Sequence, residues 1–410
     1  MSRHHASEEP ASHENEQART EEHRHEERER AETLRHRLGL SRRGLLAATT
    51  GLAAAAAFAP PQSAAAQTAA RTAAQGTPAP AGGGAHGRAL IPPGKRGIIL
   101  YTVRDAIARD PLSTTLPSGF RAVLQALSAI GYRQVEFAGY RQHANAEGGA
   151  DLETVEGAAL LRRWLDDNGL RAEGNHGFIP GSWPLTTADL DRFKRVLEIA
   201  NILGLDHMGT GSDPTGSAYK ADWDLAAEKW NALGEIARRA GIKLYTHNHD
   251  AAYAFLLDSG PLDEQGRPTR SSGIRKLEYF FRISDPRRVY FEMDIFWAHV
   301  ARFKHHTYTA PDGSQCRDVF DPLATVRARE WRFPLFHAKD GTSNPAVPNG
   351  YDMVPFGTGH IDYRRFFSRL RDRGAHNPMY EQDNAPNAAD PAQSLRLAEL
   401  SYRNMAALRG

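Results

Sequence analysis

Two histidines, His247 and His249, stand at alternate positions in the segment THNHD, directly after the short apolar run GIKLY. A neutral imidazole at the end of a strand can ligate a divalent metal ion or exchange a proton with a substrate. Two histidines can equally be polar residues that close a loop. The choice depends on whether other coordinating side chains follow neighbouring strands of the same fold.

Acidic, basic and imidazole side chains follow most of the other short apolar runs. Taken singly, each has a structural explanation, such as a hydrogen-bonded core histidine, a helix N-cap or a surface carboxylate. Taken together they favour a metal site, because several buried carboxylates on one rim need a positive charge among them. The groups are Glu136, His176, Asp294, His337, Lys339, Asp340, Glu381 and Asp383.

The mixture of imidazole and carboxylate groups indicates which metal ion these residues would hold. Such donors favour Mn²⁺, Zn²⁺, Co²⁺ or Fe²⁺ over Ca²⁺, and Mg²⁺ is less favoured if a pair of imidazoles takes part. Cys316 is the only cysteine of the chain. A chain with a single cysteine can form neither an intrachain disulfide nor a cysteine-rich metal site.

A repeating unit from Gly97 onward would position these groups: an amphipathic helix, a glycine and a short apolar strand. Gly131, Gly169, Gly204 and Gly241 occupy the joints, where a left-handed helix C-cap favours glycine. Strands that alternate with helices predict parallel pairing. The strands are expected near residues 98–103, 133–138, 170–175, 205–210, 242–247, 288–294, 333–338 and 378–382.

Eight such units in residues 97–410 predict an α/β fold of the (β/α)8 TIM barrel type. An open, doubly wound sheet is the alternative, but no phosphate-binding glycine fingerprint follows the first strand. In a barrel the catalytic residues lie at the carboxyl ends of the strands. The longest irregular stretches, 251–272 and 304–321, follow strands and are expected on the same face.

At seven motifs the chain resembles the sugar phosphate isomerase/epimerase family, the xylose isomerase-like TIM barrels, over residues 97–408. The motifs, in the order of the family, are ILYTVRDA, IGYRQVEFAGY, THNHD, FEMDIFWAHVA, FHAKDG, PFGTGHIDYRRFF and YEQDN. The resemblance implies one divalent cation. Its ligands would be a carboxylate after the fifth strand, an aspartate after the sixth, a histidine after the seventh and a glutamate after the eighth.

Carried over to this sequence, the last three ligands correspond to Asp294, His337 and Glu381. At the fifth strand His247 stands in place of the glutamate, as in a branch of the family. His249 is similar to a substrate-contacting histidine of relatives, although a shift of the loop would make it the ligand instead. Epimerases of the family use two metal-bound glutamates, and this chain retains only Glu381 of that pair.

The resemblance also implies proton transfer next to a metal-bound carbonyl/hydroxyl pair of a sugar. Glu381 is the retained glutamate of the family's pair, and Lys339, His176, His249 and Glu136 are the remaining candidate acids and bases. A nearby cation would lower the pKa of Lys339. An ion pair with Asp340 or Asp383 is the structural alternative for Lys339. The candidate substrate contacts are Glu136, His176, Arg104, Trp297 and Asp383.

These features favour a metal-dependent sugar isomerase or epimerase. The alternative on the same scaffold is a lyase that removes a proton beside a ketone and expels an oxygen, as in relatives that dehydrate inososes or cleave 3-keto-glycosides. An apurinic-site endonuclease shares the barrel but needs a three-metal cluster and a basic face for DNA, which a nearly neutral chain lacks. A non-catalytic sugar-binding protein is the remaining alternative.

The chain before the expected barrel has a different composition. Residues 1–40 are rich in Glu, Arg and His and are expected to be disordered. Arg42 and Arg43 then precede an alanine-rich apolar stretch that resembles a twin-arginine export signal, with an alanine-rich linker helix as the alternative. Prolines interrupt this stretch, so a stable membrane span is not expected.

The expected order is therefore a charged region and export signal in residues 1–66, a flexible Ala/Gly/Pro linker in 67–96, and the barrel in 97–410. Removal of residues 1–66 changes the net charge only from +2 to about +3, so nucleic acid is not an expected partner. We expect a periplasmic or extracellular protein whose partners are the export machinery and a small sugar or sugar derivative. The sequence leaves the oligomeric state open.

Overall fold

The computed structural model describes residues 87–410. The expected charged region, the twin-arginine signal and most of the expected linker lie outside the described residues. The folded unit begins at Arg88, earlier than the expected boundary at residue 97. Ala89 forms an antiparallel bridge with Arg409, and Leu90 is buried. This short segment therefore packs as part of the barrel.

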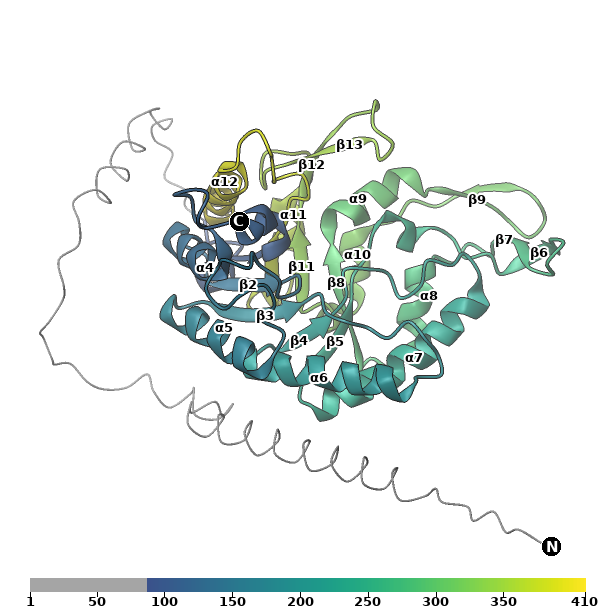
Figure 1. Cartoon of the computed structure of the whole chain (residues 1–410). Coiled ribbons are helices and arrows are strands. Elements are labelled where there is room, and N and C mark those ends of the chain that lie inside the picture. The colour runs from purple at the N-terminus through teal and green to yellow at the C-terminus, as the bar shows by residue number, and fades with distance from the viewer. Residues whose placement is uncertain (1–86) are drawn as a thin grey trace, which may run out of the picture. The chain divides into compact units, whose positions relative to one another are not determined.

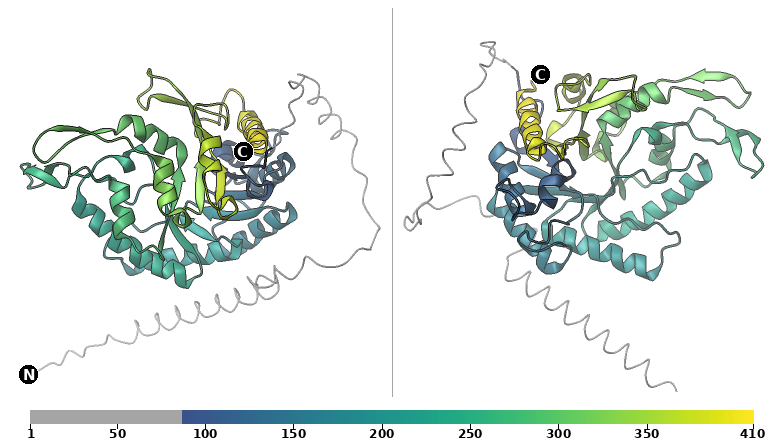
Figure 2. Two further views of the ribbon diagram at one scale, coloured as in Figure 1. Left: turned by 180° about the vertical axis from the view of Figure 1, so that it is seen from behind. Right: turned by 45° about the horizontal axis from the view of Figure 1, so that its top comes forward.

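Eight parallel strands form a nearly closed barrel, as the sequence predicts (Figures 1 and 2). The sheet order is β3-β2-β1-β14-β11-β8-β5-β4, so the strands follow one another around the barrel as they do along the chain. A parallel bridge between His176 and Gly209 joins the two ends of the sheet. The strands are β1 (Gly97–Ile99), β2 (Gln134–Phe137), β3 (Arg171–Asn175), β4 (His207–Gly209), β5 (Lys243–Thr246), β8 (Val289–Asp294), β11 (Leu335–Ala338) and β14 (Asn377–Tyr380).

Helices cover the outside of the barrel between successive strands (Figure 1). Their apolar residues recur at the helical period and face the strands; in α6 (Thr187–Leu203), for example, Phe193, Val196 and Leu197 are buried. Within residues 87–410 no helix is both long and apolar enough to cross a membrane. The other helices are α3 (Arg104–Ala108), α4 (Gly119–Ile130), α5 (Val155–Asp167), α7 (Lys220–Arg239), α8 (Lys276–Ile283), α9 (Ile295–Lys304), α10 (Pro322–Ala328), α11 (Tyr363–Ser368) and α12 (Gln393–Ala407).

Glycines end helices where the sequence predicts them. Gly204 caps α6 with a φ of 74°, and its N–H donates to the carbonyls of Ala200 and Asn201. Gly131 follows α4 with a φ of 123°, and a Cβ atom there would lie 2.4 Å from the ring of Tyr402. Both positions require the conformational freedom of glycine, and Gly131 also requires its small size.

Three β-hairpins lie in the connections after β5, β8 and β11, and the hairpin after β8 follows helix α9. The expectation that 251–272 and 304–321 are irregular is wrong, because each stretch contains a β-hairpin. A glycine in the left-handed region closes each hairpin: Gly266 has a φ of 72° and Gly313 a φ of 93°. These two hairpins project from one side of the barrel (Figure 1). The hairpins are β6 (Ser259–Leu262) with β7 (Pro268–Arg270), β9 (Thr307–Thr309) with β10 (Gln315–Arg317), and β12 (Asp340–Ser343) with β13 (Tyr351–Val354).

The interior of the barrel has polar residues at both ends. At the amino ends of the strands, Gln134 donates to Glu173 at 2.6 Å, and Nδ1 of His207 lies 3.0 Å from the carbonyl oxygen of Glu173. A second polar group lies at the carboxyl ends. Between the two is a buried apolar cluster of Ile99, Tyr245, Leu335 and Met379.

Candidate metal centre

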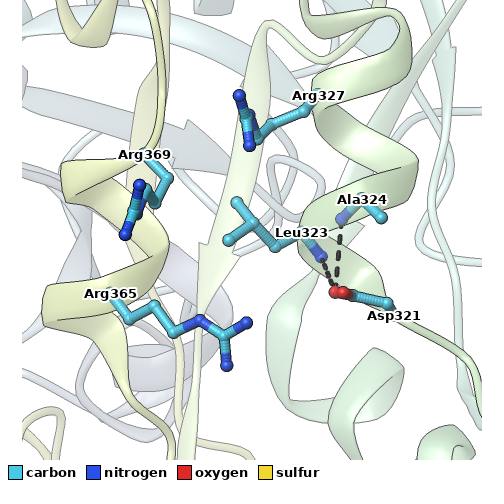
Figure 3. A pocket seen from close by; sticks show the side chains of 6 residues that line it. All are labelled: Asp321, Leu323, Ala324, Arg327, Arg365 and Arg369. Atoms are coloured by element: carbon cyan, nitrogen blue, oxygen red, sulfur yellow. Dashed lines mark hydrogen bonds between the residues drawn. The ribbon is translucent and has the colours of Figure 1, made fainter.

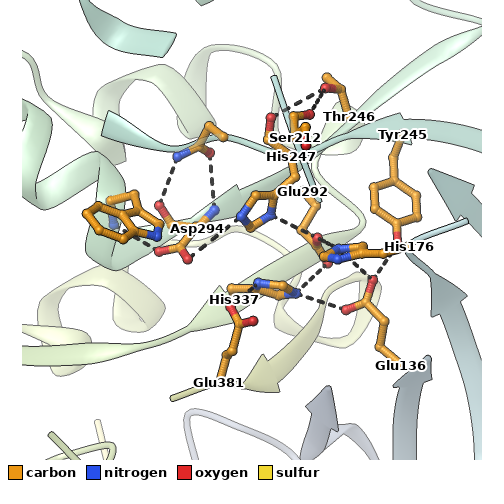
Figure 4. A network of polar contacts seen from close by, with 12 residues as sticks. Glu136, His176, Ser212, Tyr245, Thr246, His247, Glu292, Asp294, His337 and Glu381 are labelled. Atoms are coloured by element: carbon orange, nitrogen blue, oxygen red, sulfur yellow. Dashed lines mark hydrogen bonds and ion pairs between the residues drawn. The ribbon is translucent and has the colours of Figure 1, made fainter. Parts of the chain in front are cut away.

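The four side chains that the sequence predicts as metal ligands lie on four neighbouring strands (Figure 4). His247 follows β5, Asp294 ends β8, His337 lies in β11 and Glu381 follows β14. Ligand atoms of Asp294, His337 and Glu381 all lie within 4.8 Å of one another. Nδ1 of His337 is 2.7 Å from Oε2 of Glu381, and Nε2 of His247 is 3.8 Å from Oδ2 of Asp294. Asp294, His337 and Glu381 thus form a compact group that could hold one ion, and His247 lies beside it in an adjoining group that shares His337.

The chemistry of this group fits a divalent cation. All four residues are buried, at exposures of 0% to 5%. Oδ2 of Asp294, Nδ1 of His337 and Oε2 of Glu381 lie within 4.8 Å of one another, and charged contacts join them to one another and to the ammonium of Lys339. Two carboxylate oxygens and an imidazole nitrogen directed at one another are a donor set that a metal ion would use.

A second carboxylate of β8, that of Glu292, orients the two imidazoles. Its Oε2 is hydrogen-bonded to Nδ1 of His247 at 3.0 Å, and its Oε1 lies 3.2 Å from Nε2 of His337. Glu136 is hydrogen-bonded to the same Nε2 at 3.0 Å. With these nitrogens engaged, His247 presents Nε2 and His337 presents Nδ1 to the carboxylates of the group.

Glu292 is absent from the predicted site, although the sequence carries a signal for it. Every second side chain of a strand points to the same face, and Glu292 stands two residues before Asp294. Both are buried in β8. Nε2 of His176 lies 2.9 Å from Glu292, so His176, His247, Glu292 and His337 form an adjoining group with the spacing of metal ligands.

Burial and neighbouring charges shift the pKa values of these residues. Burial, and then the charge of Glu292, raises the pKa of Glu136 to about 7. Burial raises the pKa of Asp294 to about 6 and lowers the pKa of His247 to about 3. His247 is therefore neutral near pH 7, as metal ligation requires. Burial would also lower the pKa of His337, but the adjacent carboxylates, Glu292 foremost, raise it above its usual range. Metal binding would release that proton.

Lys339 lies among the carboxylates at the mouth of the barrel. Its ammonium is 2.8 Å from Glu381, 3.0 Å from Asp294 and 3.1 Å from Asp383. Burial would lower the pKa of Lys339, but these three anions raise it above its usual range. The shift is opposite to the expected one because the nearest charges are negative. Asp340 is not a partner of this lysine, since its carboxylate accepts hydrogen bonds from backbone N–H groups of its own loop.

His249 lies beside the predicted ligands, against Trp297. Its ring centroid is 5.4 Å from that of His247 and 5.5 Å from that of Trp297, and its backbone N–H donates to Asp213 at 3.0 Å. The geometry favours His247 over His249 as the fourth ligand, because Nε2 of His247 faces Asp294. Asp213, which is absent from the predicted site, has its pKa raised to about 6 by burial.

Two of the predicted substrate contacts, Glu136 and His176, differ in their exposure to solvent. Glu136 is fully buried and accepts a hydrogen bond from the hydroxyl of Tyr245. It is also hydrogen-bonded to Nε2 of His337, and its contact with a substrate stays a prediction. The side chain of His176 is 16% exposed, above Glu136, and remains accessible from the barrel mouth.

The predicted substrate contact Arg104 is engaged by the backbone. Its guanidinium donates to the carbonyl oxygens of Tyr101 and Asp383, both at 2.8 Å. It also lies over the ring of Tyr101, 3.9 Å from the centroid. Arg104 therefore holds the loop that follows β14, and through it fixes the backbone of Asp383. Of these two predicted substrate contacts, Asp383 is the one whose side chain remains accessible, since it is 33% exposed.

Away from this group, a surface hollow of about 180 Å³ lies between α10 and α11 (Figure 3). Three exposed arginines line it. Arg327 and Arg365 lie in the last turns of α10 and α11, and Arg369 is the C-cap of α11. Basic side chains at helix C-termini complement the helix dipole. The helix ends thus account for these charges, and the hollow is not part of the candidate site.

Comparison with known proteins gives a family and a fold. The model of the xylose isomerase-like TIM barrel family matches residues 124–399. No curated protein matches the chain.

Solved structures with the same fold include two described as sugar phosphate isomerase/epimerase from Parabacteroides distasonis. One is 23% identical, with 77% of this chain and 94% of that chain covered and a TM-score of 0.53. The other is 16% identical, with 75% and 96% covered and a TM-score of 0.52. The probable 3-DHS dehydratase AsbF from Bacillus anthracis is 12% identical, with 75% and 97% covered and a TM-score of 0.50. Since the family model spans more than half of the sequence and the eight-stranded barrel agrees with it, the chain belongs to the xylose isomerase-like TIM barrel family.

Proposed function

We propose that this chain is a divalent-metal-dependent isomerase or epimerase that acts on a sugar or sugar derivative. The observation that carries the proposal is the meeting of Asp294, His337 and Glu381 at the carboxyl ends of the strands, with buried ligand atoms within 4.8 Å of one another. His247 adjoins them, with Nε2 3.8 Å from Oδ2 of Asp294. Membership of the xylose isomerase-like family supports an enzyme of this class.

Two imidazoles and two carboxylates would hold the ion. This set supports Mn²⁺, Zn²⁺, Co²⁺ or Fe²⁺, and Mg²⁺ less, because imidazole is a softer donor than oxygen. The charges of Asp294 and Glu381 would balance a divalent ion. Glu292 and Glu136 would hold the imidazoles in the orientation that ligation needs.

A bound divalent ion would polarise adjacent carbonyl and hydroxyl oxygens of a sugar and acidify the C–H bond between them. Glu381 is the proposed residue that takes or returns the proton, and His249, beside the ligands, is the second. Trp297 offers a flat apolar face to the sugar ring. His176 and the partly exposed Asp383 would bind its hydroxyl groups.

A lyase remains the alternative function of the same residues. It would begin with the same proton removal and continue by expelling a hydroxyl or glycosidic oxygen from the neighbouring carbon. His247 at the position of the family's second glutamate supports this alternative, because the chain retains only Glu381 of the pair that epimerases of the family use. The fold does not separate the two functions.

The product distinguishes the two functions. The Co²⁺-loaded protein would be incubated separately with free ketoses and with 3-keto-glycosides, and the products followed by NMR in D₂O. A stereoisomer or aldose with deuterium at the reacting carbon supports the isomerase or epimerase, whereas an alkene or a released aglycone supports the lyase. Protein stripped with a chelator is the control. Sugar binding that is unchanged by the metal, with no turnover, would overturn both enzyme proposals.

We also propose export by the twin-arginine route, which rests on the sequence of residues 1–66 alone. Phosphorylated sugars are scarce outside the cytoplasm, so export favours an unphosphorylated substrate. Residues 1–66 fused to a reporter that is exported only when folded would test the signal. Replacement of Arg42 and Arg43 by lysine should abolish export, and export that persists in this variant would contradict the proposal.

A further inference from the structure

The ammonium of Lys339 is enclosed by three carboxylates at the mouth of the barrel. It lies 2.8 Å from Oε2 of Glu381, 3.0 Å from Oδ2 of Asp294 and 3.1 Å from Oδ1 of Asp383. The side chain is only 2% exposed. Such a buried ammonium is stable only when it is paired, and here its pairs neutralise carboxylates that would otherwise repel one another.

Two of these carboxylate atoms are also the atoms that face the imidazoles. Oδ2 of Asp294 lies 3.8 Å from Nε2 of His247, and Oε2 of Glu381 lies 2.7 Å from Nδ1 of His337. An ion ligated by these atoms, at the usual distance of about 2.1 Å, would stand within a few ångströms of the ammonium. Two cations so close together in a buried site repel strongly. The ammonium and a metal ion therefore compete for the same oxygens.

Asp383 differs from the other two carboxylates in a way that suits a second position for the ammonium. Its side chain is 33% exposed, whereas those of Asp294 and Glu381 are 0% and 7% exposed. Arg104 holds its backbone carbonyl at 2.8 Å. Both of its carboxylate oxygens lie close to Nζ of Lys339, at 3.1 Å and 3.2 Å. The lysine can thus release Asp294 and Glu381 and still keep one charged partner.

We propose that Lys339 is the resident counter-cation of the metal centre: its ammonium neutralises Asp294 and Glu381 in the absence of an ion and withdraws to Asp383 when an ion binds. The inference rests on the proposed function, since it requires that these residues bind a metal. Lys339 then sets the affinity and selectivity of the centre. Only ions that hold the two carboxylates more strongly than the ammonium displace it.

The proposal predicts opposite effects for the two partners of this ion pair. Lys339→Met removes the competitor, so Co²⁺ should bind at least about 10-fold more tightly. The same change leaves Asp294 and Glu381 without a counter-cation, so the metal-free variant should melt about 5 °C or more below the wild type, and Co²⁺ should restore its stability. Asp383→Asn removes the second position of the ammonium, so Co²⁺ should bind about 5-fold or more weakly.

A double-mutant cycle separates this exchange from general electrostatics. Co²⁺ binding would be measured by calorimetry and by the visible absorption of the bound ion in the wild type, the two single variants and the double variant. If Asp383 acts through Lys339, Asp383→Asn changes the dissociation constant in the wild-type background but not in Lys339→Met. Equal effects in both backgrounds would overturn the exchange. Lys276→Met, which removes another buried lysine whose neighbours are Asp213 and Asp250, is the matched control and should leave Co²⁺ affinity unchanged.

The cycle also distinguishes failure of this inference from failure of the proposed function. A wild type without any Co²⁺ absorption would overturn the metal centre itself. A wild type that binds Co²⁺ with the same affinity as Lys339→Met would overturn only the role of Lys339. If Lys339→Met does not fold, a crystal structure of the Co²⁺-loaded wild type decides. Nζ should then be bonded to Asp383 and be well beyond the present 3.0 Å from Oδ2 of Asp294, and an unchanged distance would overturn the proposal.

Discussion

Nδ1 of His337 lies 2.7 Å from Oε2 of Glu381. Backbone pairing brings the two residues near each other, because His337 of β11 pairs with Met379 of β14, and Glu381 follows two residues later, where a strand's side chains return to the same face. On its other side His337 pairs in register with Asp294. The ladder of parallel strands thus holds three predicted ligands side by side. Their spacing is therefore fixed by the barrel.

Loss of the His337 imidazole should remove most of the metal. We expect purified His337→Ala to carry little bound ion and to bind Co²⁺ more than about 100-fold more weakly, because three or fewer donors remain at the centre. Elemental analysis and calorimetry would measure this. His376→Ala is the matched control, since His376 is a buried histidine bonded to Phe333 and Glu330 elsewhere in the barrel. Equal metal content in the wild type and His337→Ala would show that the ligand assignment is wrong.

Glu292→Gln should weaken metal binding without removing a ligand. The amide keeps the shape of the side chain but loses the charge that holds Nδ1 of His247 and Nε2 of His337. We expect affinity for Co²⁺ to fall about 10-fold to 100-fold, as for other groups that orient metal-binding imidazoles. Glu278→Gln, a partly buried glutamate of α8, is the control. An unchanged affinity in Glu292→Gln would mean that the imidazoles are oriented without it.

The two histidines of the THNHD segment should respond differently to removal. His247→Ala should lower metal affinity about 10-fold or more, because Nε2 of His247 faces Asp294. His249→Ala should keep its metal and lose turnover, about 100-fold in kcat, because its ring lies beside the ligands against Trp297. Metal content and steady-state kinetics would be measured on both variants. The reverse pattern would assign the fourth ligand to His249.

Acid should destabilise the fold through a histidine at the opposite end of the barrel. Burial lowers the pKa of His207 to about 4, whereas in the unfolded chain a histidine titrates near 6.5. The unfolded state therefore binds the extra proton first as the pH falls. The contribution of His207 to the free energy of unfolding is fully present above about pH 6.5. As the pH falls toward about 4, this contribution is lost, and the protein is destabilised by up to about 3 kcal/mol.

Urea unfolding of chelator-treated protein between pH 7.5 and pH 4.5 would test this dependence. The free energy of unfolding of the wild type should fall more steeply with acid than that of His207→Gln, which cannot take up the proton. Parallel curves for the two proteins would show that His207 does not contribute. The metal is removed beforehand because acid would otherwise also release the bound ion, and this loss would change the stability of both proteins.

Local patterns in the sequence were sufficient to predict the barrel and the region of the site. Helical periodicity and glycine at helix ends are properties of neighbouring residues, so they can be read along the chain without knowing the fold. Parallel strands put their carboxyl ends at one mouth. The meeting of Asp294, His337 and Glu381 therefore follows from where each stands relative to its strand.

Tertiary structure alone decided which atoms of those residues face one another. The support of both imidazoles by Glu292, the enclosure of Lys339 by three anions and the direction of Nε2 of His247 depend on distances across the barrel between residues from different strands. The raised pKa of Lys339 follows from those distances together with burial. Sequence periodicity predicts neither these distances nor this pKa shift. It indicates the face of a strand or helix on which a side chain lies, but not which residue of another strand that side chain contacts.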